Sequence, residues 1–316
     1  MVVIGVDLGG TKSAVALFST DGVLIHKQTA ALASLSGEAV GQLIISQIQG
    51  LLDEASVQGL EVAAAGVSVP GIYYATSGCV WAPNVPGWVK YPLRSRLNEA
   101  FRSLQIRIDS DRAAYILGEV WQGCARGCQN AIFLAIGTGI GAGILIDGKI
   151  LRGAQDIAGA VGWMGLQQPF HAEYATCGAF EYYASGEGLA RLARHYLIQD
   201  PTYQGPLRAK PVSVISSYDL FDLLDQEDEL VKKVFGQAVQ LWGMAAANLI
   251  STFNPQKLIF GGGVFGPASR FIDAIRGVAG QWAQPISMKH CAIDISTIGS
   301  DAGLIGAAKI GLSALE

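Results

Sequence analysis

The chain opens with two apolar runs that a short polar turn separates. Residues 2–6 are apolar and lead into Asp7, a second apolar run covers residues 14–18, and Leu-Gly-Gly-Thr-Lys lies between them at residues 8–12. Paired glycines supply the positive φ that a short hairpin loop demands, so this pattern predicts a β-hairpin. A third strand is expected at residues 23–27, after the turn at Gly22.

Further along, β-rich runs alternate with segments of helical periodicity. Residues 38–55 show helical spacing, whereas residues 61–69 form a β-rich run closed by Pro70-Gly71. Residues 72–88 are irregular but aromatic, which favours a binding loop over disorder. The other expected helices are 92–104, 112–122, 180–196, 230–253, 270–283 and 301–312. The other expected strands are 105–108, 131–136, 144–146, 149–151, 257–260 and 291–295, and residues 154–176 and 199–213 are expected to be irregular.

The arrangement of strand, glycine turn and strand occurs twice. Residues 131–136 lead into Gly-Thr-Gly-Ile-Gly-Ala-Gly at 137–143, and two more strands follow as in the opening segment. We interpret this as an internal duplication, and a length of 316 residues also exceeds the usual size of one core. The expected domains are residues 1–122, joined by the closing helix 301–316, and residues 123–300.

Composition narrows the class of protein. Hydrophobic residues make up 50% of the chain and charged residues 15%, which is typical of a globular protein with much buried parallel sheet. The formal net charge of −4 and the lack of a Lys/Arg cluster argue against a nucleic-acid partner. No signal peptide or membrane span is predicted, and five scattered cysteines favour a reducing cytoplasm over a disulfide framework. For Cys124 and Cys128, two small buried thiols are favoured over a metal site.

The glycine turns and one strand end carry the candidate chemistry. Backbone N–H groups at Gly9 to Thr11, with the ammonium of Lys12, are suited to a phosphate chain whose magnesium Asp7 could hold. The alternative is an ordinary hairpin with a charged tip, and the second turn at residues 137–143 favours the phosphate interpretation. The strand 105–108 delivers Asp109-Ser110-Asp111 to the start of a helix. There Asp111 or Asp109 is either the N-cap of that helix or a catalytic group, and the sequence pattern does not decide between these two roles.

Six motifs in a fixed order make the chain similar to the ROK family (repressor, open reading frame, kinase) of the actin/hexokinase-like ATPase superfamily. They are DLGGTK at 7–12, APNVPGW at 82–88, SDRAAYILGE at 110–119, GTGIGAG at 137–143, CGAFEYYASG at 177–186 and GGGVFG at 261–266. The resemblance covers essentially the whole chain. It implies an α/β fold of two actin-like ATPase (ribonuclease H-like) domains, each a mixed sheet flanked by helices, with a cleft between them.

The resemblance also implies roles for individual residues. Asp111 would be the catalytic base, and Asp7 would hold Mg²⁺. The phosphates of ATP would contact Asp7, Gly9, Gly10, Thr11 and Lys12 at one turn and Gly137, Thr138, Gly139 and the residues up to Gly141 at the other. Gly261, Gly262 and Gly263 would approach the adenosine, and Asn84, Ser110, Asp111, Trp163 and Glu181 would contact the sugar.

The sugar and zinc region departs from the family pattern. Where the family has a Glu that accepts sugar hydroxyls, this chain has Ala160, and the His that binds zinc and sugar is Trp163. The three cysteines of the family's zinc loop are Ala172, Tyr174 and Ala179 here, and Cys177 is out of register with all three. These residues cannot assemble a four-ligand zinc site. We therefore expect no structural zinc, with Trp163, Phe170 and Tyr174 packing the segment 154–176 instead. The family Asn before the catalytic Asp is Ser110, and the normally small residue after it is Arg112.

The expected function is an ATP-dependent kinase that phosphorylates a hydroxyl of a sugar or sugar derivative. The alternatives are a non-catalytic sugar or nucleotide sensor descended from such kinases, and a kinase of a non-sugar hydroxyl compound. The chain begins within one residue of its first strand, which argues against the DNA-binding branch of the family. The resemblance implies a homodimer. The substrate, the phosphorylated hydroxyl and the choice between ATP and polyphosphate stay open. Ala160 and Trp163 favour a derivatised or otherwise unusual sugar over plain glucose, and the alternative is that Trp163 only fills the space left by the zinc loop.

Overall fold

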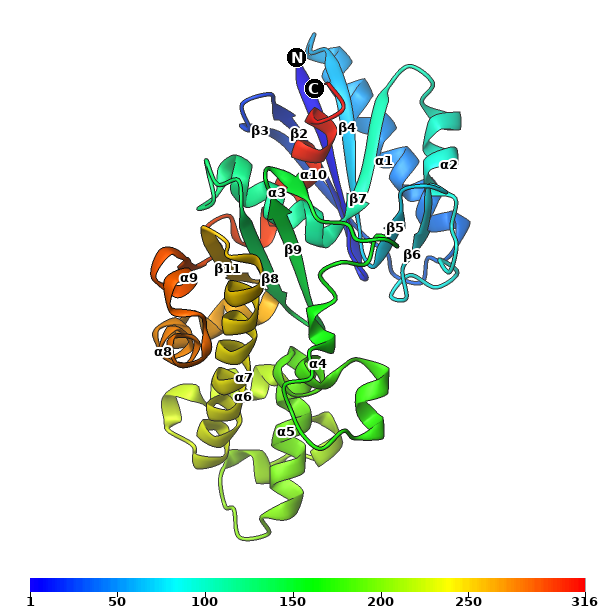
Figure 1. Ribbon diagram of the computed structural model, residues 1–316. Coiled ribbons are helices and arrows are strands. Elements are labelled where there is room, and N and C mark those ends of the chain that lie inside the picture. The colour runs from blue at the N-terminus through cyan, green and yellow to red at the C-terminus, as the bar shows by residue number, and fades with distance from the viewer. Residues whose placement is uncertain (316) are drawn as a thin grey trace. The chain divides into compact units, whose positions relative to one another are not determined.

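The computed structural model describes residues 1–315, and the chain forms two compact units and two five-stranded sheets (Figure 1). The first unit takes residues 1–128, residues 143–158 and the C-terminal segment from Thr297, and the second takes residues 129–142 and 159–296. Compared with the expected division at residue 122, the first unit also includes residues 123–128, 143–158 and 297–300. Of the expected closing helix 301–316, residue 316 lies outside the described residues.

The sheet of the first unit has the strand order β3-β2-β1-β4-β7. β1 (Val2–Leu8) pairs antiparallel with β2 (Lys12–Ser19), as the hydrophobic pattern predicts, and Gly9 N–H closes the turn on Lys12 O at 2.9 Å. β2 pairs antiparallel with β3 (Leu24–Ala31), while β4 (Val62–Val69) and β7 (Gln105–Ser110) run parallel to β1. The carboxyl ends of β1, β4 and β7 therefore meet at one edge of the sheet.

Helices cover both faces of this sheet. Val2, Ile4 and Val6 of β1 belong to a core cluster with residues of α1 (Glu38–Val57) and α2 (Leu93–Ala100). Val3 belongs to a second cluster on the other face, with Leu304 and Ala308 of α10 (Ala302–Leu312). A Cβ at Gly5 would lie 2.6 Å from Leu304 O, so only glycine lets α10 pack this closely on β1. α10 also packs against α3 (Asp111–Gln122).

The second sheet repeats the order of strands, β10-β9-β8-β11-β12. β8 (Ala131–Ile136) runs parallel to β11 (Lys257–Gly261), which runs parallel to β12 (Ala292–Ile295), and β9 (Ile140–Ile146) pairs antiparallel with β10 (Lys149–Ile150). The mixed α/β architecture with two such sheets is the fold class that the sequence predicted. The other helices of the second unit are α4 (Ala179–Ala184), α5 (Gly186–Gln199), α6 (Ser217–Asp222), α7 (Glu229–Phe253), α8 (Ile272–Trp282) and α9 (Pro285–His290).

Several expected elements differ in detail. The stretch 72–88 contains a small hairpin of β5 (Ile72–Tyr74) and β6 (Cys79–Trp81), and its Trp88 is buried and stacked on Tyr91 at 4.4 Å between ring centroids. Trp88 therefore packs in the core, while the binding role of the loop stays a prediction. The expected helix 180–196 is two helices, because Ser185 has extended backbone and caps α5 by accepting from Gly188 N–H. No helix within residues 1–315 is long and apolar enough to cross a bilayer.

Candidate functional site

The first glycine turn lies against the loop that carries Asn84. Gly10, Thr11 and Lys12 are exposed, and a Cβ built on Gly10 would lie 3.2 Å from Asn84 Cβ. Two segments more than seventy positions apart in the sequence are thus neighbours in the first unit. The turn therefore has an open side for an anion, next to an amide side chain that can donate and accept hydrogen bonds.

Asp7 stands at the carboxyl end of β1, where it is partly buried. Its Oδ1 accepts a 2.9 Å hydrogen bond from Ser68 Oγ on β4, and a Cβ on Gly303 would come 2.5 Å from its Oδ2. The first turn of α10 thus packs directly against the carboxylate. Burial raises the pKa of Asp7; the Ser68 hydrogen bond and Lys12 oppose that shift, while Asp301 adds to it. A cation bound at this carboxylate would favour its charged form.

Asp111 is the first residue of α3, but it does not cap the helix. The N-cap is Ser110, whose side chain accepts from Ala113 N–H at 3.4 Å. Asp111 Oδ1 accepts a hydrogen bond from the adjacent Arg112 N–H at 2.8 Å. The N-cap interpretation of Asp111 and Asp109 is therefore wrong, because the residue between them fills that position.

The pKa of Asp111 is raised to about 6, in the range that suits a general base near neutral pH. Burial is the largest cause; Arg112 lowers the pKa, and the negative charge of Asp7 raises it. Tyr115 lies one helical turn further along α3, and burial together with Asp111 and Asp7 raises the pKa of its phenol well above the usual value. The charges of Asp7 and Asp111 therefore each affect the pKa of Tyr115, and the charge of Asp7 also affects that of Asp111.

Asp109 has a structural partner. Its Oδ1 accepts from Arg152 Nη1 at 2.9 Å, its Oδ2 pairs with Arg152 Nη2, and the residue is only 5% exposed. Burial nevertheless raises the pKa of Asp109, with Arg152 opposing the shift.

Arg112 bridges two backbone carbonyls, donating from Nη2 to Gly71 O at 3.2 Å and from Nη1 to Ala158 O at 3.5 Å. These contacts hold the strand end that carries Asp111.

In the second unit, two glycine turns converge at the end of β8. Gly262 has φ 89°, and a Cβ there would lie 2.5 Å from Ile136 O. A Cβ on Gly137 would come 3.9 Å from Gly263 N. The turn at 137–139 closes with Gly137 N–H on Gly139 O at 2.9 Å and is tied to α5 by Gly186 N–H on Gly137 O at 2.7 Å. The structure thus brings together two segments that the resemblance assigns to one nucleotide.

Glu181 of α4 supports the same turn. Its Oε2 accepts a 2.6 Å hydrogen bond from Ile140 N–H, and burial raises its pKa while Ile140 and Arg191 oppose the shift.

Trp163 lies close to the start of α4, because a Cβ on Gly178 would overlap Trp163 Cα. The Trp163 side chain is 56% exposed and Phe170 is 74% exposed, whereas Tyr174 is buried. The expectation that Trp163 and Phe170 are buried anchors of the segment 154–176 is wrong, although the Phe170 ring packs edge-on against Tyr174 at 5.9 Å, and Tyr174 is the buried residue of the three.

The residues in the expected zinc region do not fit a zinc ion. Within residues 1–315 no three His, Cys, Asp or Glu side chains gather as a metal site would require, and Cys124 and Cys128 are half-buried rather than buried. Aromatic side chains gather there instead. The hydroxyls of Tyr174 and Tyr183 are 2.8 Å apart, and the ring of Tyr174 contacts the rings of Tyr182 and Tyr183 edge-on at 5.4 and 5.7 Å. The region that was expected to lack zinc is thus a cluster of packed tyrosine rings, and the absence of zinc stays a prediction.

Sequence reasoning missed Tyr115 and Arg152. The position of Tyr115, four residues after Asp111 on a predicted helix, placed both on one face and was a usable signal. Arg152 carried no local signal, because its partner Asp109 is 43 positions away and only the fold brings them together.

Comparisons with known proteins agree with this arrangement. Residues 3–313 match the model of the ROK family. A glucokinase of Halalkalibacterium halodurans is 30% identical over 311 residues, which cover 96% of this chain and 92% of that protein. A ROK family glucokinase of Streptomyces griseus, solved with glucose and AMPPNP, has a TM-score of 0.79 at 27% identity and covers 99% of this chain and 100% of that one. A ROK hexokinase of Thermus thermophilus has a TM-score of 0.81 at 28% identity, with 100% of this chain and 99% of that chain covered.

Proposed function

The chain belongs to the ROK family, and from that premise we propose that it is an ATP-dependent sugar kinase that transfers the γ-phosphate to a hydroxyl of a sugar or sugar derivative. The kinase and nucleotide parts of this proposal are supported by relatives named glucokinase and by the AMPPNP in the Streptomyces griseus structure. The observation that carries it in this chain is Asp111, a strand-end carboxylate that caps no helix and has a pKa of about 6.

Asp111 is proposed as the general base. Phosphoryl transfer asks the protein mainly to position the reactants and stabilise charge, together with a carboxylate that accepts the proton of the attacking hydroxyl. With a pKa of about 6, Asp111 is mostly ionised at pH 7 yet basic enough to take up a proton as the oxygen attacks. Arg112 and Asp7 act on its pKa in opposite directions.

The turns at Gly9–Lys12 and Gly137–Gly139 are proposed to bind the phosphates through their backbone N–H groups, with Gly261–Gly263 at the adenosine. The carboxylate of Asp7 fits the oxygen donors that Mg²⁺ prefers, and Lys12 lies close enough to lower its pKa. Magnesium, when bound with ATP, would neutralise charge on the transferring phosphate. The protein is proposed to need no structural zinc, since the tyrosine cluster occupies the region where the family ligands would stand.

A derivatised sugar is the proposed substrate class, because Ala160 leaves room where the family has a carboxylate and the exposed Trp163 offers an apolar face. Asn84, Ser110, Asp111 and Glu181 are proposed to contact the hydroxyls nearer the reaction. The homodimer that the resemblance implies belongs to the same proposal and is checked by light scattering.

The decisive experiment is a turnover screen with ATP or polyphosphate as donor and glucose, mannose, N-acetylglucosamine or N-acetylmannosamine as acceptor. We expect ATP-dependent turnover, with kcat/KM for an N-acetylated sugar at least equal to that for glucose. Trp163→Ala should lower kcat/KM for the N-acetylated sugar more than that for glucose. Saturable sugar binding without any turnover would instead identify a sensor. A tenfold preference for glucose would show that Ala160 and Trp163 do not select a derivative.

A further inference from the structure

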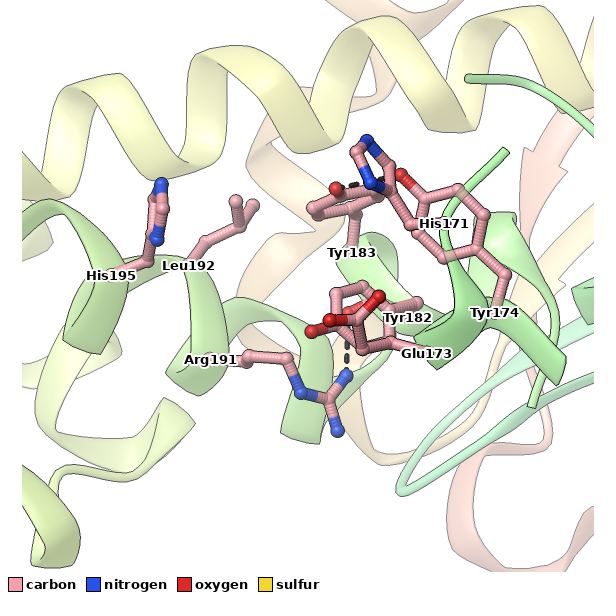
Figure 2. A pocket seen from close by; sticks show the side chains of 8 residues that line it. All are labelled: His171, Glu173, Tyr174, Tyr182, Tyr183, Arg191, Leu192 and His195. Atoms are coloured by element: carbon pink, nitrogen blue, oxygen red, sulfur yellow. Dashed lines mark hydrogen bonds between the residues drawn. The ribbon is translucent and has the colours of Figure 1, made fainter. Parts of the chain in front are cut away.

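A pocket of about 420 Å³ lies entirely within the second unit and is lined in part by α4 (Figure 2). Its walls come from the segment before α4, from α4 and from α5. Glu181 on α4 bonds to the turn at Ile140, whereas the next two residues, Tyr182 and Tyr183, face this pocket. The lining residues are His171, Glu173, Tyr174, Tyr182, Tyr183, Arg191, Leu192 and His195.

We propose that this pocket is a second carbohydrate site, which takes a neutral mono- or disaccharide. Its volume lies within the range of about 300–1,000 Å³ that is usual for small-molecule sites. The proposal concerns binding alone and does not depend on the kinase activity proposed above.

The aromatic floor supplies the first part of the recognition. Tyr174 is buried at the centre of the cluster, and Tyr182 and Tyr183 are half-buried, with their rings 5.0 Å apart and nearly perpendicular. Such amphipathic rings present an apolar surface beside a polar hydroxyl. The C–H face of a sugar ring matches the apolar surface, and sugar hydroxyls match the phenol oxygens.

The charged groups of the pocket decide which class of ligand fits. One carboxylate, Glu173, and one guanidinium, Arg191, belong to the same lining, so their formal charges cancel and the lining favours neither a net anion nor a net cation. A purely apolar ligand would bury the Glu173 carboxylate and the remaining N–H donors of Arg191 without giving them hydrogen bonds, which is costly. Neutral hydroxyls can donate to Glu173 and accept from Arg191, and the imidazoles of His171 and His195 add hydrogen-bonding groups at the rim.

The pocket is held in shape before any ligand binds. Arg191 Nη1 donates to Tyr182 O at 2.7 Å, its guanidinium carbon lies 4.1 Å from the centroid of the Tyr182 ring, and Tyr174 and Tyr183 share their hydroxyl contact (Figure 2). A site that is ordered in advance loses less freedom on binding.

The test is ¹⁹F NMR of protein labelled with fluorotyrosine, without ATP. Resonances of Tyr182 and Tyr183, assigned with Tyr→Phe variants, report the pocket, and that of Tyr115 reports the neighbourhood of Asp111. The probes are glucose, N-acetylglucosamine and maltose, with gluconate as the anion and choline as the cation. We expect at least one neutral sugar to shift the Tyr182 and Tyr183 resonances saturably, while gluconate and choline do not.

Two variants locate the binding. His195→Trp fills the pocket mouth from an exposed position and should abolish these shifts, while Ile198→Trp, at another exposed position of α5, should leave them unchanged. Glu173→Gln should weaken the binding about tenfold, since it removes a charged hydrogen-bond acceptor. The proposal is overturned if no neutral sugar shifts these resonances, if gluconate or choline does so instead, or if the shifts survive in His195→Trp and follow Tyr115. A failure of turnover alone would leave it intact.

Discussion

The carboxylate of Glu181 accepts a 2.6 Å hydrogen bond from the backbone N–H of Ile140. The residue that family resemblance assigns to sugar hydroxyls is thus bonded to the turn that the same resemblance assigns to phosphate. Glu181 and Ile140 both belong to the second unit. This unit therefore contains a direct hydrogen bond between a proposed sugar-binding residue and the proposed phosphate-binding turn.

Substitution of Glu181 should therefore affect both substrates. Glu181→Ala removes the acceptor of Ile140 N–H, and we expect KM for ATP and KM for the sugar each to rise about tenfold or more. Glu181→Gln keeps an oxygen acceptor and should leave KM for ATP within about twofold of wild type. Steady-state kinetics checks this, with Glu187→Ala, an exposed residue of α5, as the control. An unchanged KM for ATP in Glu181→Ala would contradict the connection.

Asp111→Asn should fold and bind sugar but turn over about 10²–10⁴-fold more slowly, the usual contribution of a general base. In the wild type, kcat/KM should rise with pH and level off above about pH 6, because only the ionised carboxylate accepts a proton. The pH–rate profile and calorimetric sugar binding measure both effects. A variant with near wild-type kcat would exclude Asp111 as the base.

The same substitution should increase stability at neutral pH. The pKa of Asp111 is raised from 3.8 to about 6 in the folded protein, so folding favours the protonated form, and the contribution of this group to stability falls as the pH rises from 3.8 through 6. Asparagine carries no charge, so the variant should gain up to about 3 kcal/mol above pH 6 and nothing below pH 3.8. Urea unfolding at several pH values measures the gain. The exposed Asp53→Asn should change stability by less than about 0.5 kcal/mol, and an equal gain there would refute the argument.

The pair Asp109–Arg152 should be needed for stability at neutral pH. Arg152→Gln leaves the buried Asp109 carboxylate without its counter-ion, and we expect a loss of about 2–3 kcal/mol, below that of a fully buried pair because the Arg152 side chain is 39% exposed. Burial raises the pKa of Asp109, so at pH 4 more of it is protonated and the loss should shrink. The double variant Asp109→Asn/Arg152→Gln should regain part of the stability at pH 8. A loss that does not vary with pH would argue against this explanation.

The tyrosine cluster should hold its segment without metal. Tyr174→Phe loses the hydroxyl contact with Tyr183 but keeps the ring, and should cost about 1 kcal/mol, whereas Tyr174→Ala should cost about 3–5 kcal/mol. Treatment with EDTA should leave the melting temperature unchanged, and elemental analysis should detect no bound zinc. One tightly held zinc per chain, or a large drop in melting temperature with EDTA, would refute this.

Local sequence patterns predicted most of the elements that position the site. The hairpin at β1 and β2 follows from two apolar runs around Gly-Gly, and the placement of Asp111 between β7 and α3 follows from a β-rich run that ends where helical periodicity begins. The motifs at the glycine turns are enough to indicate the family from the sequence alone. These features are local, because each depends on residues within about ten positions of one another.

Tertiary structure alone decided which groups became partners. Whether Asp109, Ser110 or Asp111 caps α3 depends on the precise end of β7 and on Arg152, which lies 43 positions from Asp109. Likewise, Trp88 is buried while Trp163 is exposed, although both are tryptophans in irregular segments. The burial of a side chain depends on contacts between segments that are distant in the sequence, and a single sequence does not specify those contacts. The sequence thus determined the elements and the candidate chemistry, and long-range packing decided which side chains remain open to a ligand.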